Sequence, residues 1–165
     1  MWRAFLIGAA LSLAAVGAAE AKSPPRDILG LRLGMGEAEA HRRLARLGKE
    51  AGYEPAKLER NKELWEVRDG RIASVAVKFD DQHRVSWITA FSRPEGKRLR
   101  YRDLGDLEKA ERQGYYIYMW KVPARGESRA YAVMARGSDP EKLGNYALFY
   151  PPTPGTSEEE REESD

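Results

Sequence analysis

The spacing of apolar residues changes once along the chain, and this change constrains the fold more than any other feature. In residues 37–47 apolar side chains recur at helical spacing, whereas from Glu63 onward they alternate with polar ones at a period of two. Two alternating runs, residues 64–68 and 71–79, are separated by Asp69-Gly70, a pair that favours a two-residue type I′ turn. The sequence therefore predicts a helix followed by an antiparallel hairpin.

The second half of the chain repeats this order of helix and strands. Asp103 is a suitable N-cap for a second helix. The apolar stripe and the stop of that helix are Leu104, Leu107, Ala110 and Gly114. Further strands are expected at residues 84–91, 115–122, 129–136 and 146–150. We therefore predict an α+β fold, with an antiparallel sheet of about five to six strands and two helices packed on one face.

The first 21 residues have the pattern of a secretory signal. Arg3 precedes an apolar stretch at residues 4–19, and Ala19-Glu20-Ala21 supplies the small residues that a signal peptidase requires. We expect the mature chain to begin at Lys22 and to be periplasmic or secreted, although an uncleaved N-terminal anchor stays open. No later apolar run approaches the roughly 20 residues of a membrane span, so no transmembrane segment is expected after cleavage.

The chain contains no cysteine, and this excludes several classes of protein. Lipid attachment at the mature N-terminus of an exported bacterial protein, a structural disulfide and a thiol nucleophile all require cysteine. We expect residues 22–27 to form an extended linker and residues 28–150 to form the α+β domain, stabilised by its apolar core alone. Residues 151–165 are predicted to be a Pro-rich and then acidic disordered tail. We expect this tail to increase solubility or to fold back over a basic face.

Two short motifs resemble a known family of envelope proteins. Residues 31–36 lead into a helix that ends Leu44-Ala45-Arg46-Leu47-Gly48, and residues 75–80 are followed by Arg84-Val85. These segments resemble the small outer-membrane-assembly lipoprotein family (SmpA/OmlA type) and the β-lactamase-inhibitor-protein modules. The resemblance covers about the first half of the mature chain. It implies a periplasmic helix-and-sheet module that binds other envelope proteins, without the lipid anchor of that family.

No catalytic motif is present in the sequence. The chain has two histidines, His41 and His83, and it lacks a nucleophile elbow, a phosphate-binding glycine loop and a pair of zinc ligands at helical spacing. Residues 80–83 gather potential oxygen and nitrogen ligands of a metal in a hairpin loop, but Asp and His are typical of turns for conformational reasons alone. His41 is interpreted as a packing or surface residue of the first helix. We therefore expect no enzyme activity, no cofactor and no bound metal.

Aromatic residues gather in the expected strand at residues 115–122. At a period of two, Tyr116, Tyr118 and Trp120 share one face of that strand. Tyrosine and tryptophan supply rigid contact area with a polar group, so these side chains are candidate binding residues on an exposed platform. The alternative is a central strand whose aromatic side chains belong to the core.

Arginines alternate in the segment before the second expected helix. If residues 97–102 are extended, Arg98, Arg100 and Arg102 point the same way and form a candidate site for phosphates or carboxylates. The alternative is an edge strand protected from aggregation by charge. In an exported protein we expect an anionic envelope surface as the partner and no nucleic acid.

These observations predict an exported, non-catalytic cell-envelope protein that acts as a protein-interaction or assembly module, with an envelope protein as partner. Two alternatives stay open: a soluble carrier of a small ligand or lipid that uses the aromatic face, and an unrecognised hydrolase. A pocket closed between sheet and helices favours the carrier, whereas a flat exposed sheet face favours the interaction module.

Overall fold

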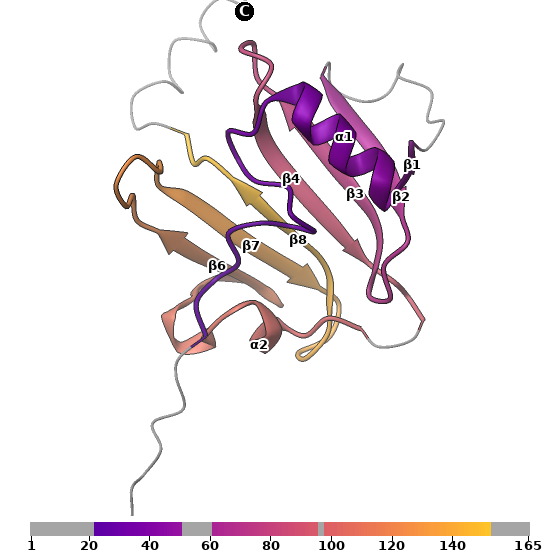
Figure 1. Ribbon diagram of the computed structural model, residues 1–165. Helices are drawn as coiled ribbons and strands as arrows, with labels where there is room; N and C mark the ends of the chain where they lie inside the picture. The colour runs from indigo at the N-terminus through magenta and orange to yellow at the C-terminus, as the bar shows by residue number, and fades with distance from the viewer. Residues whose placement is uncertain (1–21, 51–60, 96–97, 153–165) are drawn as a thin grey trace, which may run out of the picture.

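The computed structural model describes residues 22–50, 61–95 and 98–152 (Figure 1). The predicted signal and the acidic part of the tail lie outside these residues. The described chain forms one eight-stranded antiparallel sheet with the strand order β1-β2-β3-β4-β8-β7-β6-β5. Within these ranges, no helix is long and apolar enough to span a bilayer.

The strands and helices have the following bounds. The strands are β1 (Gly48–Glu50), β2 (Lys62–Val67), β3 (Ile72–Phe79), β4 (Val85–Ser92), β5 (Glu111–Gly114), β6 (Ile117–Val122), β7 (Tyr131–Gly137) and β8 (Leu143–Phe149). The helices are α1 (Glu37–Leu47), α2 (Tyr101–Leu104) and a 3₁₀ turn at Leu107–Lys109.

The first helix and the first hairpin are confirmed. α1 buries Ala40 and Leu44 against the sheet. β2 and β3 pair in the predicted antiparallel sense. The turn between them is wider than predicted, because neither Asp69 nor Gly70 has the positive φ that a type I′ turn requires. Instead, the Asp69 carboxylate accepts hydrogen bonds from the backbone N–H groups of Arg71 and Ile72.

The predicted fold class is wrong in its proportions. The sheet has eight strands rather than five or six, and only α1 among the described helices exceeds four residues. The second helix ends at Leu104, and the next residue, Gly105, is extended. Glycine at this position lets the indole of Trp120 approach closely, because a Cβ there would lie 3.0 Å from the indole nitrogen. That indole N–H donates to the Asp106 carbonyl at 2.8 Å. The chain therefore leaves the helical path after one turn.

The two additional strands lie at the edges of the sheet. β1 and β5 are three and four residues long, and they contain glycine and charged or polar residues instead of an apolar alternation. They are positioned by pairing with β2 and β6. A short polar edge strand gives no period-two signal, so the sequence pattern does not reveal it.

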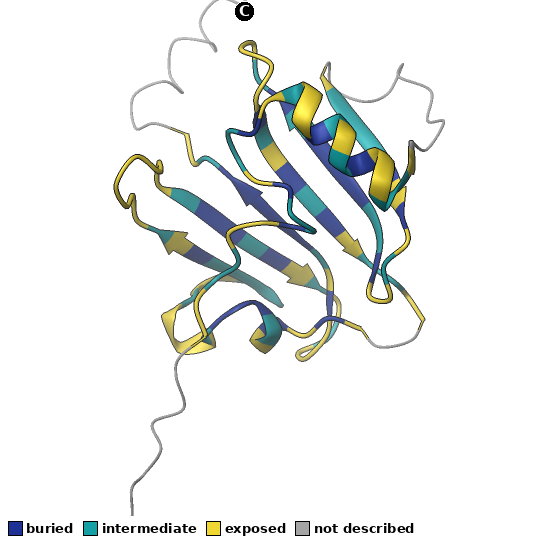
Figure 2. Ribbon diagram, in the orientation of Figure 1, coloured by how far each residue is buried: buried dark blue, intermediate teal, exposed yellow. Residues whose placement is uncertain are grey.

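The core lies on one face of the sheet. α1 and residues 28–36 lie in front of the strands, and α2 lies at the lower end of the sheet (Figure 1). Tyr101 and Leu104 of α2 belong to the same core. Successive side chains of a strand point to opposite faces, and along β4 buried and more exposed residues accordingly take turns (Figure 2). Along β8 the last four residues, 146–149, are all buried. The fully buried side chains include Leu31, Leu44, Val77, Ile88, Val133 and Leu148.

The buried Tyr146 makes the stability of this core sensitive to alkaline pH. Burial is the main cause that raises the pKa of its hydroxyl to about 12, against 10.0 for an ordinary tyrosine. The unfolded chain therefore loses this proton at a lower pH than the folded chain does. The stabilisation is complete below pH 10 and is lost as the pH rises towards 12.

We expect Tyr146→Phe to flatten the decline in unfolding free energy between pH 10 and 12 by about 2–3 kcal/mol. Chemical denaturation at each pH measures this slope. The exposed Tyr115, 84 % accessible, is the matched control, and Tyr115→Phe should leave the slope unchanged. If the unfolding free energy declines equally with pH in the wild type and in Tyr146→Phe, burial of the Tyr146 hydroxyl is not the cause of the pH sensitivity.

Candidate functional site

An apolar surface covers the face of the sheet opposite α1. We call it the open face, and no described element packs over it. Trp87 and Phe91 of β4 are exposed on it, and Met119 and Met134 are partly buried. They surround three buried side chains of β7 and β8, which are Ala132, Ala147 and Phe149. Such a contiguous apolar surface is characteristic of a docking site, whereas isolated exposed apolar residues are ordinary.

Two aromatic residues of β4 dominate the open face. Trp87 and Phe91 are 36 % and 37 % exposed, although both are large apolar side chains. Trp87 pairs across the strands with Phe149, and their rings stack at 4.3 Å with an angle of 16°. The indole N–H of Trp87 also donates to the Thr89 hydroxyl at 2.8 Å. The tryptophan is therefore held in a defined orientation at the surface.

Basic side chains border the open face. A hollow of about 360 Å³ lies over it, and its charged lining residues are Lys62, Lys78 and Arg136. The guanidinium of Arg136 lies 3.1 Å from the sulfur of Met134. Lys121, on the neighbouring β6, forms an ion pair with Glu111 at 2.8 Å. The apolar surface thus has a rim on which positive charge predominates.

The predicted aromatic residues lie on the other side of the sheet. Trp120 is 2 % exposed and belongs to the core, and Tyr116 and Tyr118 are partly buried against it. Tyr116 is not in a strand: it lies in the turn between β5 and β6 with a φ of 56°. Their role in binding stays a prediction, but the exposed aromatic surface is the one formed by Trp87 and Phe91.

The predicted arginines do not share an extended segment. All three are exposed, but the chain becomes helical at Tyr101, so the period-two alternation stops before Arg102. Arg98 donates to the Pro94 carbonyl at 2.7 Å. Arg100 contacts the Asp103 carboxylate at 3.4 Å. Burial raises the pKa of that carboxyl, but the hydrogen bonds from Arg100 and the nearby positive charges together outweigh burial, so the pKa is lowered. Anion binding by these arginines remains a prediction.

A larger group of arginines, which the sequence did not reveal, surrounds a hollow of about 570 Å³ at one end of the sheet. We call it the arginine hollow. Its charged lining residues are Arg26, Arg32, Arg84, Arg125 and Arg129, with Asp80 and Glu127. The guanidinium of Arg129 lies 4.3 Å above the ring of Tyr150, the orientation of a cation–π contact. These arginines come from separate segments, so no local motif predicts their meeting.

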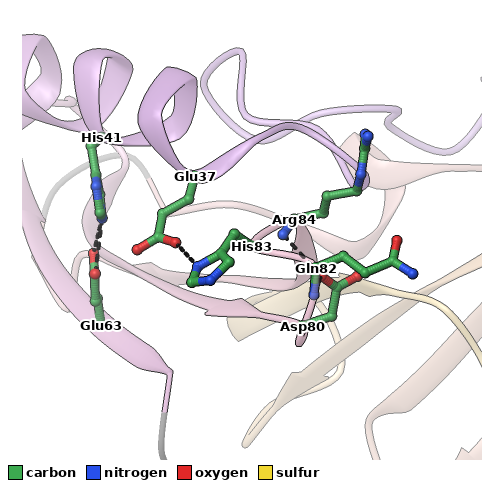
Figure 3. Close-up of polar contacts among 7 residues, drawn as sticks. All are labelled: Glu37, His41, Glu63, Asp80, Gln82, His83 and Arg84. Atoms are coloured by element: carbon green, nitrogen blue, oxygen red, sulfur yellow. Dashed lines mark hydrogen bonds and ion pairs between the residues drawn. The ribbon is translucent and has the colours of Figure 1, made fainter.

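The two histidines each contact a carboxylate beside α1 (Figure 3). His41 Nε2 lies 2.9 and 3.0 Å from the two carboxylate oxygens of Glu63 on β2. His83 Nδ1 lies 2.6 Å from a carboxylate oxygen of Glu37, the first residue of α1. Glu37, His41 and Glu63 can each present one ligand atom within 4.8 Å of the other two.

Asp80 serves the β3–β4 turn. Its carboxylate accepts hydrogen bonds from the backbone N–H groups of Gln82 and Arg84, at 3.0 and 2.9 Å. The turn holds His83 at a φ of 57°, in the left-handed region. His83 is thus the residue of this turn whose side chain contacts α1.

Comparisons of the chain with protein-family models, with curated proteins and with solved structures find no match. The geometry of these surfaces is therefore the basis for the function proposed below.

Proposed function

We propose that this protein is an exported, non-catalytic module of the cell envelope, and that it binds a protein partner through the open face. The observation that carries the proposal is the pair of aromatic residues Trp87 and Phe91, each more than one third exposed on an apolar surface. The predicted secretory signal supports the location. The resemblance of residues 31–48 to the outer-membrane-assembly lipoproteins supports a role among envelope proteins.

The chemistry of the open face favours one kind of partner surface. Aromatic and methionine side chains at the centre favour an apolar partner surface, since such residues are enriched at the buried core of protein interfaces. Lys62 and Arg136 at the rim favour carboxylates around that surface. We therefore infer a partner protein that presents an apolar patch bordered by acidic residues.

The alternatives have less support in the geometry. A carrier would use a pocket between the sheet and its helices, but the space between α1 and the sheet is filled by Leu44, Trp65, Val77 and other buried side chains. The hollow at the open face lies on the opposite surface of the sheet. The hydrolase alternative is not supported by the open face, because that face is apolar and presents no group of catalytic side chains.

Substitution of Phe91 tests the docking role. We expect Phe91→Ser to reduce crosslinking to the partner in envelope fractions, with an affinity loss of roughly 30-fold, because truncation of an interface anchor costs about 2 kcal/mol or more. The folded state should persist, since the side chain is partly exposed. Circular dichroism and thermal unfolding measure that directly.

Leu107→Ser is the matched control for Phe91→Ser. Leu107 is also 37 % exposed, but it lies in the 3₁₀ turn rather than on the open face. It should leave crosslinking unchanged. The docking proposal fails if the wild-type protein forms no specific adduct, or if both substitutions weaken the adduct equally.

The arginine hollow favours a second function, which is binding to the anionic surface of the envelope. Five arginines against two carboxylates produce an excess of positive charge around one concave surface. Guanidinium groups bind phosphate oxygens bidentately. Phosphate-bearing lipid head groups are the anionic partner that we infer here.

The affinity for vesicles that contain phosphatidylglycerol shows whether the arginine hollow or the arginines predicted from the sequence bind the anionic surface. We expect Arg125→Ala with Arg129→Ala to weaken binding by roughly 30-fold at low salt, since each arginine near an anionic surface contributes about 1 kcal/mol. Arg98→Ala with Arg102→Ala removes the same charge and should have a small effect. The reverse order would assign the site to residues 98–102.

A further inference from the structure

Both histidines of this chain lie in one cluster with two carboxylates. The chain has two histidines, and both lie beside α1, although they come from the helix and from the β3–β4 turn. Glu37 and His41 are one helical turn apart, and Glu63 reaches them from β2. Glu37 lies between the His41–Glu63 pair and His83 (Figure 3).

We propose that Glu37, His41 and Glu63 form a binding site for one divalent transition-metal ion, and that Zn²⁺ is the ion that fits it best. Imidazole nitrogen and carboxylate oxygen are ligands that zinc prefers. The site lies on the face of the sheet that α1 covers, so it is separate from the open face and does not depend on the proposed partner.

The three ligand atoms are close to the spacing that zinc requires. They lie within 4.8 Å of one another. In a tetrahedral site with bonds of about 2.0–2.2 Å, neighbouring ligand atoms are about 3.3–3.6 Å apart. His41 Nε2 and the Glu63 oxygens, 2.9 and 3.0 Å apart, would have to separate slightly, and Glu37 would have to approach by at most about 1 Å, to surround an ion of this size. Three protein ligands leave the fourth position for a water molecule.

Neighbouring side chains hold the three ligands in place. The indole N–H of Trp65 donates to a Glu63 oxygen at 2.9 Å. The ring of His41 packs edge-on against Phe79, with 5.4 Å between the ring centres. His83 contacts Glu37 at 2.6 Å. Hydrogen bonds and packing of this kind orient metal ligands and raise their affinity, so we assign His83 to the positioning of Glu37.

Partial burial makes the cluster suitable for a metal. The residues Glu37, His41 and Glu63 are all partly buried, so water screens their charges less than at an open surface. A divalent cation between the two carboxylates would offset their mutual repulsion and link α1 to β2. Zinc bound to the folded chain alone would then raise its thermal unfolding temperature.

Isothermal titration of the metal-free, untagged full chain with ZnCl₂ tests the proposal. We expect one saturable site per chain. His41→Asn and Glu63→Gln should each weaken zinc binding by at least about 100-fold, and His83→Asn by about tenfold, as for residues that orient a ligand. Glu39→Gln is the matched control: it removes a carboxylate that faces Arg43 on the same helix, and it should change nothing.

Two results overturn the metal site. One is the absence of saturable zinc binding to the wild type, which would leave two ion pairs, His41–Glu63 and Glu37–His83. The other is unchanged affinity in Glu63→Gln. If His41→Asn fails to fold, X-ray absorption of zinc-loaded His83→Asn decides the question. Imidazole scattering supports His41 as a ligand, and its absence contradicts the proposal.

Discussion

The pairing of β4 with β8 is the constraint on which the rest of the structure depends. It joins strands β1 to β4 to strands β5 to β8, so that two four-stranded halves become one continuous sheet. The pairing is non-local, because α2 and three strands lie between β4 and β8 in the sequence. Its register places Trp87 beside Phe149 on the open face and Ile88 beside Leu148 in the core. One strand pair thus contributes to both surfaces.

Local patterns predicted the elements whose stability is local. The helix at residues 37–47 and the β2–β3 hairpin follow from apolar spacing and from Asp69-Gly70, and both are confirmed. The prediction of the second helix was wrong. The hydrogen bond from Trp120 to the Asp106 carbonyl and the close approach of the Trp120 indole to Gly105 are tertiary contacts, and these override the apolar stripe of the sequence. The short polar edge strands gain their structure from their neighbours, so their own sequence carries little signal.

The candidate sites were less predictable than the fold, because each is assembled across distant segments. Alternation predicted that Val85, Trp87, Thr89 and Phe91 share one side of β4. This is wrong for Val85, because an irregularity in the pairing with β3 places Val85 in the core and Trp87 and Phe91 on the opposite face. Period-two spacing in an aromatic segment singled out Tyr116, Tyr118 and Trp120, whereas the structure buries Trp120. The aromatic side chains exposed on the sheet are Trp87 and Phe91. The histidine and arginine clusters depend on chain reversal between elements, which spacing along the sequence does not encode.

Oxidative crosslinking across β4 and β8 tests the central claim most directly, because the natural chain has no cysteine. Thr89 and Ala147 are paired across these strands, whereas Met134 lies one strand further away. Thr89→Cys with Ala147→Cys should form a disulfide. Thr89→Cys with Met134→Cys should not, since two strand spacings are about 9–10 Å and a disulfide requires less than about 7 Å between Cα atoms. A bond in the second variant, or none in the first, would contradict the single continuous sheet.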